Sequence, residues 1–105
     1  MAARKPRRGG PRFGKLRPFN KKQIGQLPDD QPVVYEGLTS TGTNLYTGSA
    51  KRGRVQERLL EHKEEGDLPG VTQFRIKKMP SVGEARAEEK RIIKQEQPKI
   101  NEQGK

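Results

Sequence analysis

The sequence contains no cysteine, only two tyrosines and one histidine, and 28% of its 105 residues are hydrophobic. Without thiols, the chain cannot form disulfides, zinc–thiolate sites or a cysteine nucleophile. It has no apolar run near the roughly 18 residues that a membrane span needs. Its basic N-terminus lacks the apolar stretch of a secretory signal. We therefore expect a soluble, cytoplasmic protein with one small domain and some unpacked chain.

Acidic residues are absent from the first 22 residues, which hold nine lysines and arginines and thus nearly all of the net charge of +10. This segment also has too much proline and glycine for a helix and too few apolar side chains for packing. We predict a disordered basic arm over residues 1–22 and a folded domain over residues 23–105. The arm can bind nucleic-acid phosphates without choosing a sequence. A solubility tail, a nuclear-type address or an anchor for another polyanion are the alternatives.

Basic residues outside the arm extend this prediction into the domain. The residues that we assign to nucleic-acid binding are Arg4, Lys5, Arg7, Arg8, Arg12, Lys51 and Arg52.

Three segments of the domain are typical of β-strands. Residues 33–38 and 44–48 have strand-like composition and are joined by a hairpin-sized loop, so they predict an antiparallel hairpin. A third strand is expected over residues 72–77. Together with two helices, the order is β-β-α-β-α. We expect an α+β fold with a small three-stranded antiparallel sheet flanked by helices.

Two helices complete the predicted domain. The first runs from about residue 54 to residue 65, and Gly66 is a typical C-terminal stop. The second begins at Ser81, which forms a capping box with Glu84. Pro98 marks its C-terminal end.

Glu89 occupies an unusual position on the second predicted helix. A carboxylate on the middle of an apolar face must be paired, protonated or bound to a cation. Pairing with Arg58 or another base is an equally good interpretation of the pattern. At about 100° per residue, Glu89 falls near the centre of an arc that it shares with Val82, Ala85, Ile92, Ile93 and Glu96.

Arg58 and His62 lie one turn apart on the first predicted helix. An arginine there can grip a phosphate through two oxygens, and a histidine can relay a proton near neutral pH. In isolation, an ordinary solvated helix face is the favoured interpretation. Tyr35 and Tyr46 can likewise be simple strand and core residues. A tyrosine base must overcome a pKa of about 10, which adjacent metal or cationic charge can lower.

Taken together and in this order, the residues resemble the GIY-YIG nuclease domain. The resemblance covers about residues 27–101, most of the chain outside the arm. The similar segments are Leu27–Tyr35, Tyr46–Lys51, Arg58 with Leu59 and His62, Glu84 through Glu89 to Lys94, Pro98 and Asn101.

The resemblance implies a divalent-metal-dependent endonuclease that hydrolyses phosphodiester bonds in nucleic acid, usually DNA. Glu89 would then be the sole carboxylate ligand of Mg²⁺, or of Mn²⁺, with most of the ion's waters retained.

It also implies roles for the other residues. Tyr35 would act as the general base or orient one, and Tyr46 would contact the reacting phosphate. Arg58 would stabilise charge on the phosphoryl oxygens. His62 would support proton traffic or phosphate contact, and Asn101 would brace the site.

Four positions depart from the family's pattern. Val33 replaces the usual glycine, Thr47 replaces an aliphatic residue, and Glu88 stands where an apolar residue is common. Arg58 lies about two residues farther from the second tyrosine than in many members. None of these changes removes a catalytic residue, so we expect an active enzyme that is monomeric by default. A non-catalytic nucleic-acid-binding protein and an accessory domain that needs a partner are the alternatives.

Overall fold

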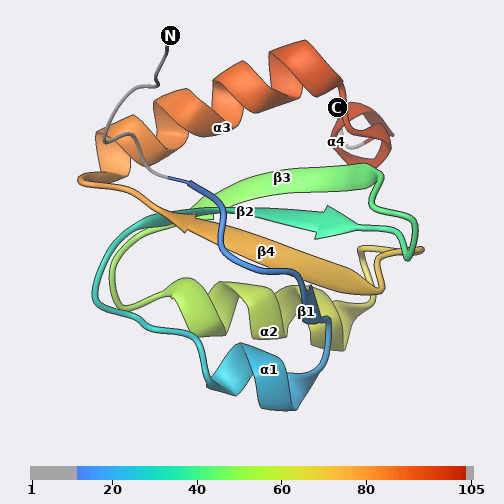
Figure 1. The fold of residues 1–105 in the computed structure, drawn as a ribbon, viewed down its shortest axis with the longest axis horizontal. Helices are drawn as coiled ribbons and strands as arrows, with labels where there is room; N and C mark the ends of the chain where they lie inside the picture. Colours follow the sequence, from blue (N-terminus) through green and yellow to red (C-terminus); the bar gives the residue numbers. More distant parts are fainter. Residues whose placement is uncertain (1–11, 104–105) are drawn as a thin grey trace, which may run out of the picture.

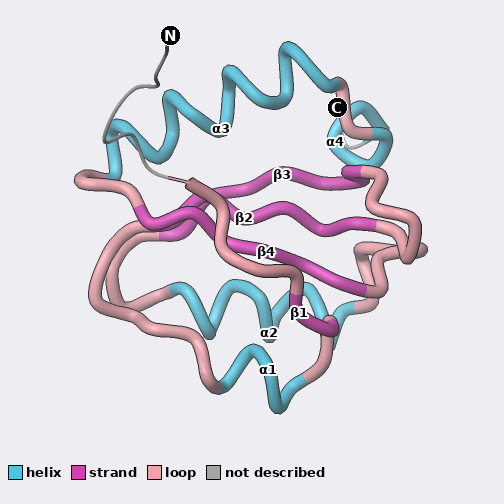
Figure 2. Tube along the Cα trace, viewed as in Figure 1, coloured by secondary structure: helices cyan, strands magenta, loops and turns pink. Residues whose placement is uncertain are grey.

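The strands form one antiparallel sheet in the computed structural model, which describes residues 12–103. The sheet order is β1-β4-β2-β3, with helices on both faces, and the whole is a compact α+β fold (Figures 1 and 2). No helix within residues 12–103 is long and apolar enough to cross a membrane. The elements are β1 Arg17–Pro18, α1 Lys21–Gly25, β2 Val33–Leu38, β3 Asn44–Ala50, α2 Val55–Glu65, β4 Gln73–Lys78, α3 Val82–Glu96 and α4 Lys99–Gln103.

The predicted hairpin of β2 and β3 is confirmed. Tyr35 lies opposite Gly48, and Val34 lies opposite Ser49. On its other side β2 pairs with β4, and because helices cover both faces of the sheet, every residue of β2 is buried. β2 therefore lies between β3 and β4 in the sheet, and β3 forms one edge.

The sheet separates two clusters of apolar side chains. Figure 1 shows α1 and α2 on one face and α3 on the other. Because successive strand residues point to opposite faces, Val33 and Tyr35 join the cluster beneath α2, and Val34 joins the cluster beneath α3. The α2-side cluster comprises Ile24, Leu27, Val33, Tyr35, Ala50, Val55, Leu59 and Phe74, and the α3-side cluster comprises Val34, Met79, Ala85 and Ile92.

Local sequence signals set the ends of the two long helices. Gly66 adopts the left-handed conformation (φ 65°) and ends α2 as predicted. The Ser81 hydroxyl accepts a hydrogen bond from the Glu84 amide at 3.2 Å, which confirms the N-terminal cap of α3. The first turn of α2 has no local side-chain cap. Instead, Asp29 Oδ1 accepts from the Val55 amide at 2.8 Å.

The predicted arm differs from the structure between residues 12 and 22. Within this stretch, Arg17 pairs with Phe74 to form the short β1, and α1 begins at Lys21. Aromatic anchors explain the difference. Phe19 packs edge-on against Phe74, with ring centroids 6.1 Å apart, so one well-placed ring orders a basic segment. The sheet therefore has a fourth strand, and the predicted arm residues Arg4, Lys5, Arg7 and Arg8 lie outside the described residues.

Candidate active site

The β2–β3 hairpin positions both tyrosines beside α2. Tyr35 is only 1% exposed, and its ring lies 6.2 Å from that of Tyr46, measured between centroids. Gly48 makes room for this arrangement. A β-carbon added at Gly48 would lie 2.6 Å from the Tyr35 hydroxyl, closer than any real contact. The absence of a side chain at this position therefore allows the buried phenol to cross the neighbouring strand.

His62 reaches the tyrosines from the last turn of α2. Its Nε2 lies 2.9 Å from the Tyr35 hydroxyl, and the residue is 8% exposed. Its Nδ1 lies 2.9 Å from Asp67 Oδ1. A carboxylate can only accept, so Nδ1 carries the proton in the neutral ring and Nε2 accepts from Tyr35. Tyr35, His62 and Asp67 thus form a continuous hydrogen-bonded chain.

Asp67 is a site residue that the sequence analysis missed. It directly follows Gly66, the residue that ends α2. The signal was nevertheless present, since a left-handed glycine turns the chain back over the last helical turn. That turn carries His62, so the first side chain after Gly66 is well placed to reach the imidazole.

Burial and nearby charges favour the protonated form of both tyrosines. Burial raises the pKa of Tyr35 well above its ordinary value, and Tyr46 and Glu89 add to the effect. Burial and then Glu89 also raise the pKa of Tyr46. The nearby Arg58 guanidinium opposes both shifts. In this state, Tyr35 is a hydrogen-bond donor to His62.

Glu89 comes from α3, on the other face of the sheet. Its Oε1 accepts a hydrogen bond from Ser49 Oγ at 2.6 Å, and its charge acts on both tyrosines across the β3 edge. The alternative of a Glu89–Arg58 pair is not found, because Arg58 Nη1 instead lies 3.2 Å from Glu61. Within residues 12–103, Glu89 forms no ion pair.

The donor set around Glu89 is sparse. No group of three or more histidine, aspartate or glutamate side chains in residues 12–103 is arranged to hold a metal ion. Mg²⁺ keeps several waters and commonly binds one or two carboxylates plus substrate phosphates. Half-buried Glu89, without a cationic partner in that part of the chain, fits such an ion.

Asn101, from α4, contacts the backbone of β3. Its Oδ1 accepts from the Thr47 amide at 2.8 Å, and its Nδ2 donates to the Thr47 carbonyl at 3.0 Å. Thr47 lies between Tyr46 and Gly48, so Asn101 holds the strand segment that supports the tyrosines.

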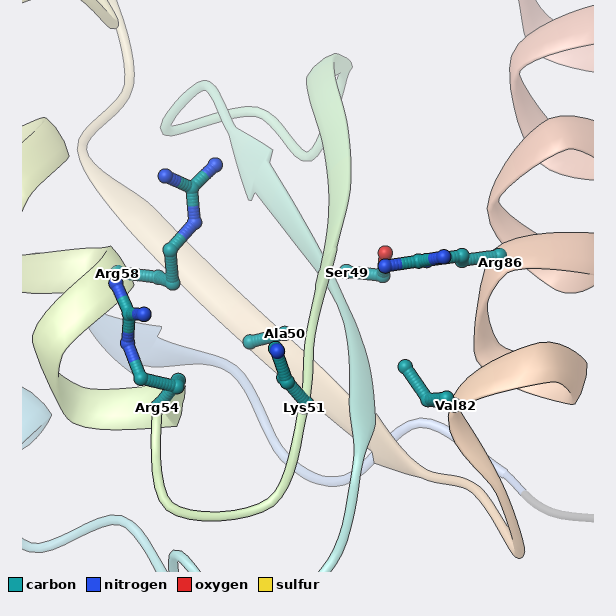
Figure 3. Close-up of a pocket in the computed structure, with 7 residues that line it drawn as sticks. All are labelled: Ser49, Ala50, Lys51, Arg54, Arg58, Val82 and Arg86. Atoms are coloured by element: carbon teal, nitrogen blue, oxygen red, sulfur yellow. The ribbon is translucent and has the colours of Figure 1, made fainter.

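A basic pocket adjoins these residues at the β3 edge (Figure 3). Its volume is about 280 Å³. In Figure 3, Arg58 comes from α2 and Arg54 immediately precedes this helix, and Arg86 extends from α3 toward Ser49. Of the basic residues predicted to bind nucleic acid, Lys51 lines this pocket, whereas Arg12 and Arg52 are exposed outside its lining. The complete lining is Ser49, Ala50, Lys51, Arg54, Arg58, Val82 and Arg86.

Comparison of the sequence with protein-family models and with curated proteins finds no match. The resemblance to the GIY-YIG nuclease domain therefore stays a prediction, which rests on the residues described above.

Proposed function

We propose that this protein is a divalent-metal-dependent endonuclease of the GIY-YIG type, acting in the cytoplasm on phosphodiester bonds of nucleic acid, with DNA as the expected substrate. The observation that carries the proposal is the group of side chains at the β3 edge. A buried phenol is hydrogen-bonded to a histidine, an arginine lies beside it, and a carboxylate without an ion-pair partner in residues 12–103 acts on it from α3.

The reaction joins a water oxygen to phosphorus and breaks one P–O ester bond. It leaves a phosphate monoester and an alkoxide, which takes a proton from solvent to become an alcohol. In this proposal Glu89 holds Mg²⁺ or Mn²⁺, which supplies Lewis-acid stabilisation of the phosphoryl oxygens when bound. Arg58 stabilises the same developing charge. Tyr46 hydrogen-bonds the phosphate.

Tyr35 takes the proton from the attacking water and passes its own proton to His62 Nε2. Asp67 orients the imidazole and stabilises the imidazolium that forms. This transfer is consistent with the raised pKa of Tyr35, because the phenol never has to exist as a free phenolate. The hydrogen-bonded chain gives its proton an acceptor at 2.9 Å.

The test is metal-dependent cleavage. Supercoiled plasmid, single-stranded DNA and RNA are incubated with the protein in Mg²⁺ or Mn²⁺ and, in parallel, in EDTA. We expect nicking that needs the metal and that Glu89→Gln reduces by about 100-fold or more.

Glu84→Gln is the matched control on the same helix. Glutamine preserves the capping box at that position, so cleavage should be unchanged. Tight nucleic-acid binding without cleavage of any substrate would contradict the nuclease proposal and favour the non-catalytic alternative.

A further inference from the structure

The basic pocket begins where the candidate active site ends. Ser49 belongs to both, because it lines the pocket and donates to Glu89. Arg58 also belongs to both, because it lines the pocket and acts electrostatically on Tyr35. A phosphate held in the pocket is therefore a close neighbour of one positioned for cleavage.

The cations of the pocket differ in how far their charge is already neutralised. Arg54 Nε lies 2.8 Å from Glu57, although without hydrogen-bond geometry, and Arg58 pairs with Glu61 at 3.2 Å. All of these residues lie on or just before α2. On the α2 side of the pocket, the positive charges of the arginines are thus offset by neighbouring glutamates.

Lys51 and Arg86 differ in this respect from Arg54 and Arg58. Neither forms an ion pair with another residue of the described chain. Lys51 follows β3, and Arg86 projects from α3 into the same pocket (Figure 3). Two cations that converge from different elements, without an ion pair in residues 12–103, favour an anionic ligand.

We propose that this pocket is a second phosphate site, in which Arg86 and Lys51 bind the phosphate adjacent to the scissile one. Arg86 supplies a planar fork that can bind two phosphate oxygens, and Lys51 supplies a point charge. The substrate class is then an internal diester of a polynucleotide strand, since a strand presents consecutive phosphodiesters, each one nucleotide from the next. This inference rests on the proposed nuclease function for its cleavage arm but not for its binding arm.

The binding arm measures the affinity of the full chain for a fluorescent single-stranded oligonucleotide in EDTA, as a function of salt. Arg86→Ala and Lys51→Ala should each weaken binding and reduce the slope of log K against log[salt] by about one unit.

Arg91→Ala is the control for Arg86→Ala. It removes the same kind of charge from the same helix, but Arg91 pairs with Glu88 instead of lining the pocket. If Arg86→Ala and Arg91→Ala lose the same amount of binding affinity, the loss reflects only the lower net charge, and the proposal is overturned. Unchanged affinity in Arg86→Ala, once circular dichroism shows that the variant is folded, would also overturn it.

The cleavage arm compares an oligonucleotide with thymidine 5′-(p-nitrophenyl phosphate), which has one diester and no neighbouring phosphate. Arg86→Ala should lower kcat/KM on the oligonucleotide by about 10- to 100-fold and leave cleavage of the small ester unchanged. An equal fall on both substrates would place Arg86 in the chemistry or the fold and overturn the proposal. If the wild-type protein cleaves neither substrate, the nuclease function fails, and the binding arm still decides the phosphate site.

Discussion

The two faces of the sheet are held by different kinds of contact. The face beneath α1 and α2 packs eight buried apolar residues, Tyr35 among them, into one cluster. The α3-side cluster has four buried apolar residues, and the charged residues Glu36 and Lys77 are also buried on that face. The candidate site draws its phenols and histidine from the first face and its carboxylate from the second.

The charged side chains of the α3 face form paired networks. Glu36 is 1% exposed, and Arg75 donates to its Oε1 at 2.8 Å. Burial raises the pKa of Glu36, and Arg75 opposes that shift. Lys77 pairs with Glu88 on α3. Apolar burial thus holds Tyr35 in a way that salt hardly changes, whereas the seating of α3, and with it Glu89, depends in part on the ion pair between Lys77 and Glu88.

Breaking the Glu36–Arg75 pair should produce the largest effect. Arg75→Met leaves a buried carboxylate without its cation and should lower the free energy of unfolding by about 2–3 kcal/mol. Urea denaturation at neutral pH measures the loss. Adding Glu36→Gln should recover part of it, because the uncompensated charge is then gone. Additive losses in the double variant would show that the pair is not coupled.

A substitution at Gly48, on the apolar face, should lower the free energy of unfolding slightly less than Arg75→Met does. In Gly48→Ala the new methyl group collides with the buried Tyr35 ring, and we expect a loss of about 1–3 kcal/mol. NMR of the His62 ring nitrogens should show a weakened bond to Tyr35. Gly25→Ala is the control, because a β-carbon at that position meets nothing within 4 Å. Equal stability of both variants would contradict the close contact.

The ion pairs of the α3 face should also be visible in the pH dependence of stability. Hydrogen bonds from Arg91 and Lys77 lower the pKa of Glu88 from 4.5 to about 2. A lowered carboxyl pKa contributes stability above the unfolded value, and this contribution disappears as the pH falls from about 4.5 toward 2. Glu88→Gln should therefore flatten the acid limb of the stability curve. If Glu88→Gln leaves the loss of stability at acidic pH unchanged, other groups cause that loss.

The raised pKa of Glu36 changes the stability of the fold with pH in the opposite direction to that of Glu88. The folded protein holds that proton more tightly than the unfolded chain, so this group's contribution to stability falls as the pH rises through its titration range. Comparing Glu36→Gln with Glu88→Gln over the same pH range separates the two effects.

The smallest change in stability is expected at Asp67. Its carboxylate is about half exposed, so Asp67→Asn should alter the free energy of unfolding by no more than about 1 kcal/mol. The variant should nevertheless shift the tautomer of His62, measured by ¹⁵N NMR, and lower cleavage. The exposed Asp30→Asn serves as the control. An unchanged tautomer in Asp67→Asn would remove Asp67 from the proton path.

Elements with strong local signals were predictable from the sequence. The hairpin followed from strand alternation and loop length, and the helix limits followed from Gly66 and Ser81. β1 and α1 were not predicted, because their order depends on contacts with residues far along the chain. Phe19, for example, packs on Phe74.

The candidate site was predictable only as a set of residue types. Helical periodicity identified Glu89 as an unusual carboxylate, but its partner Ser49 lies on a strand 40 residues earlier. Glu36 is fully buried, and its cationic partner Arg75 comes from β4, far along the chain. Such pairings are created by the assembled sheet, and no local pattern encodes them.

The amide of Asn101 has a consequence beyond the site. By accepting from the Thr47 N–H and donating to the Thr47 carbonyl, it imitates one residue of an adjoining strand. A sheet margin with free backbone groups invites pairing with another molecule. At Thr47 of β3, the Asn101 side chain occupies the backbone groups that another strand could otherwise bind. The same asparagine that holds the strand segment of the tyrosines therefore also disfavours self-association at this edge.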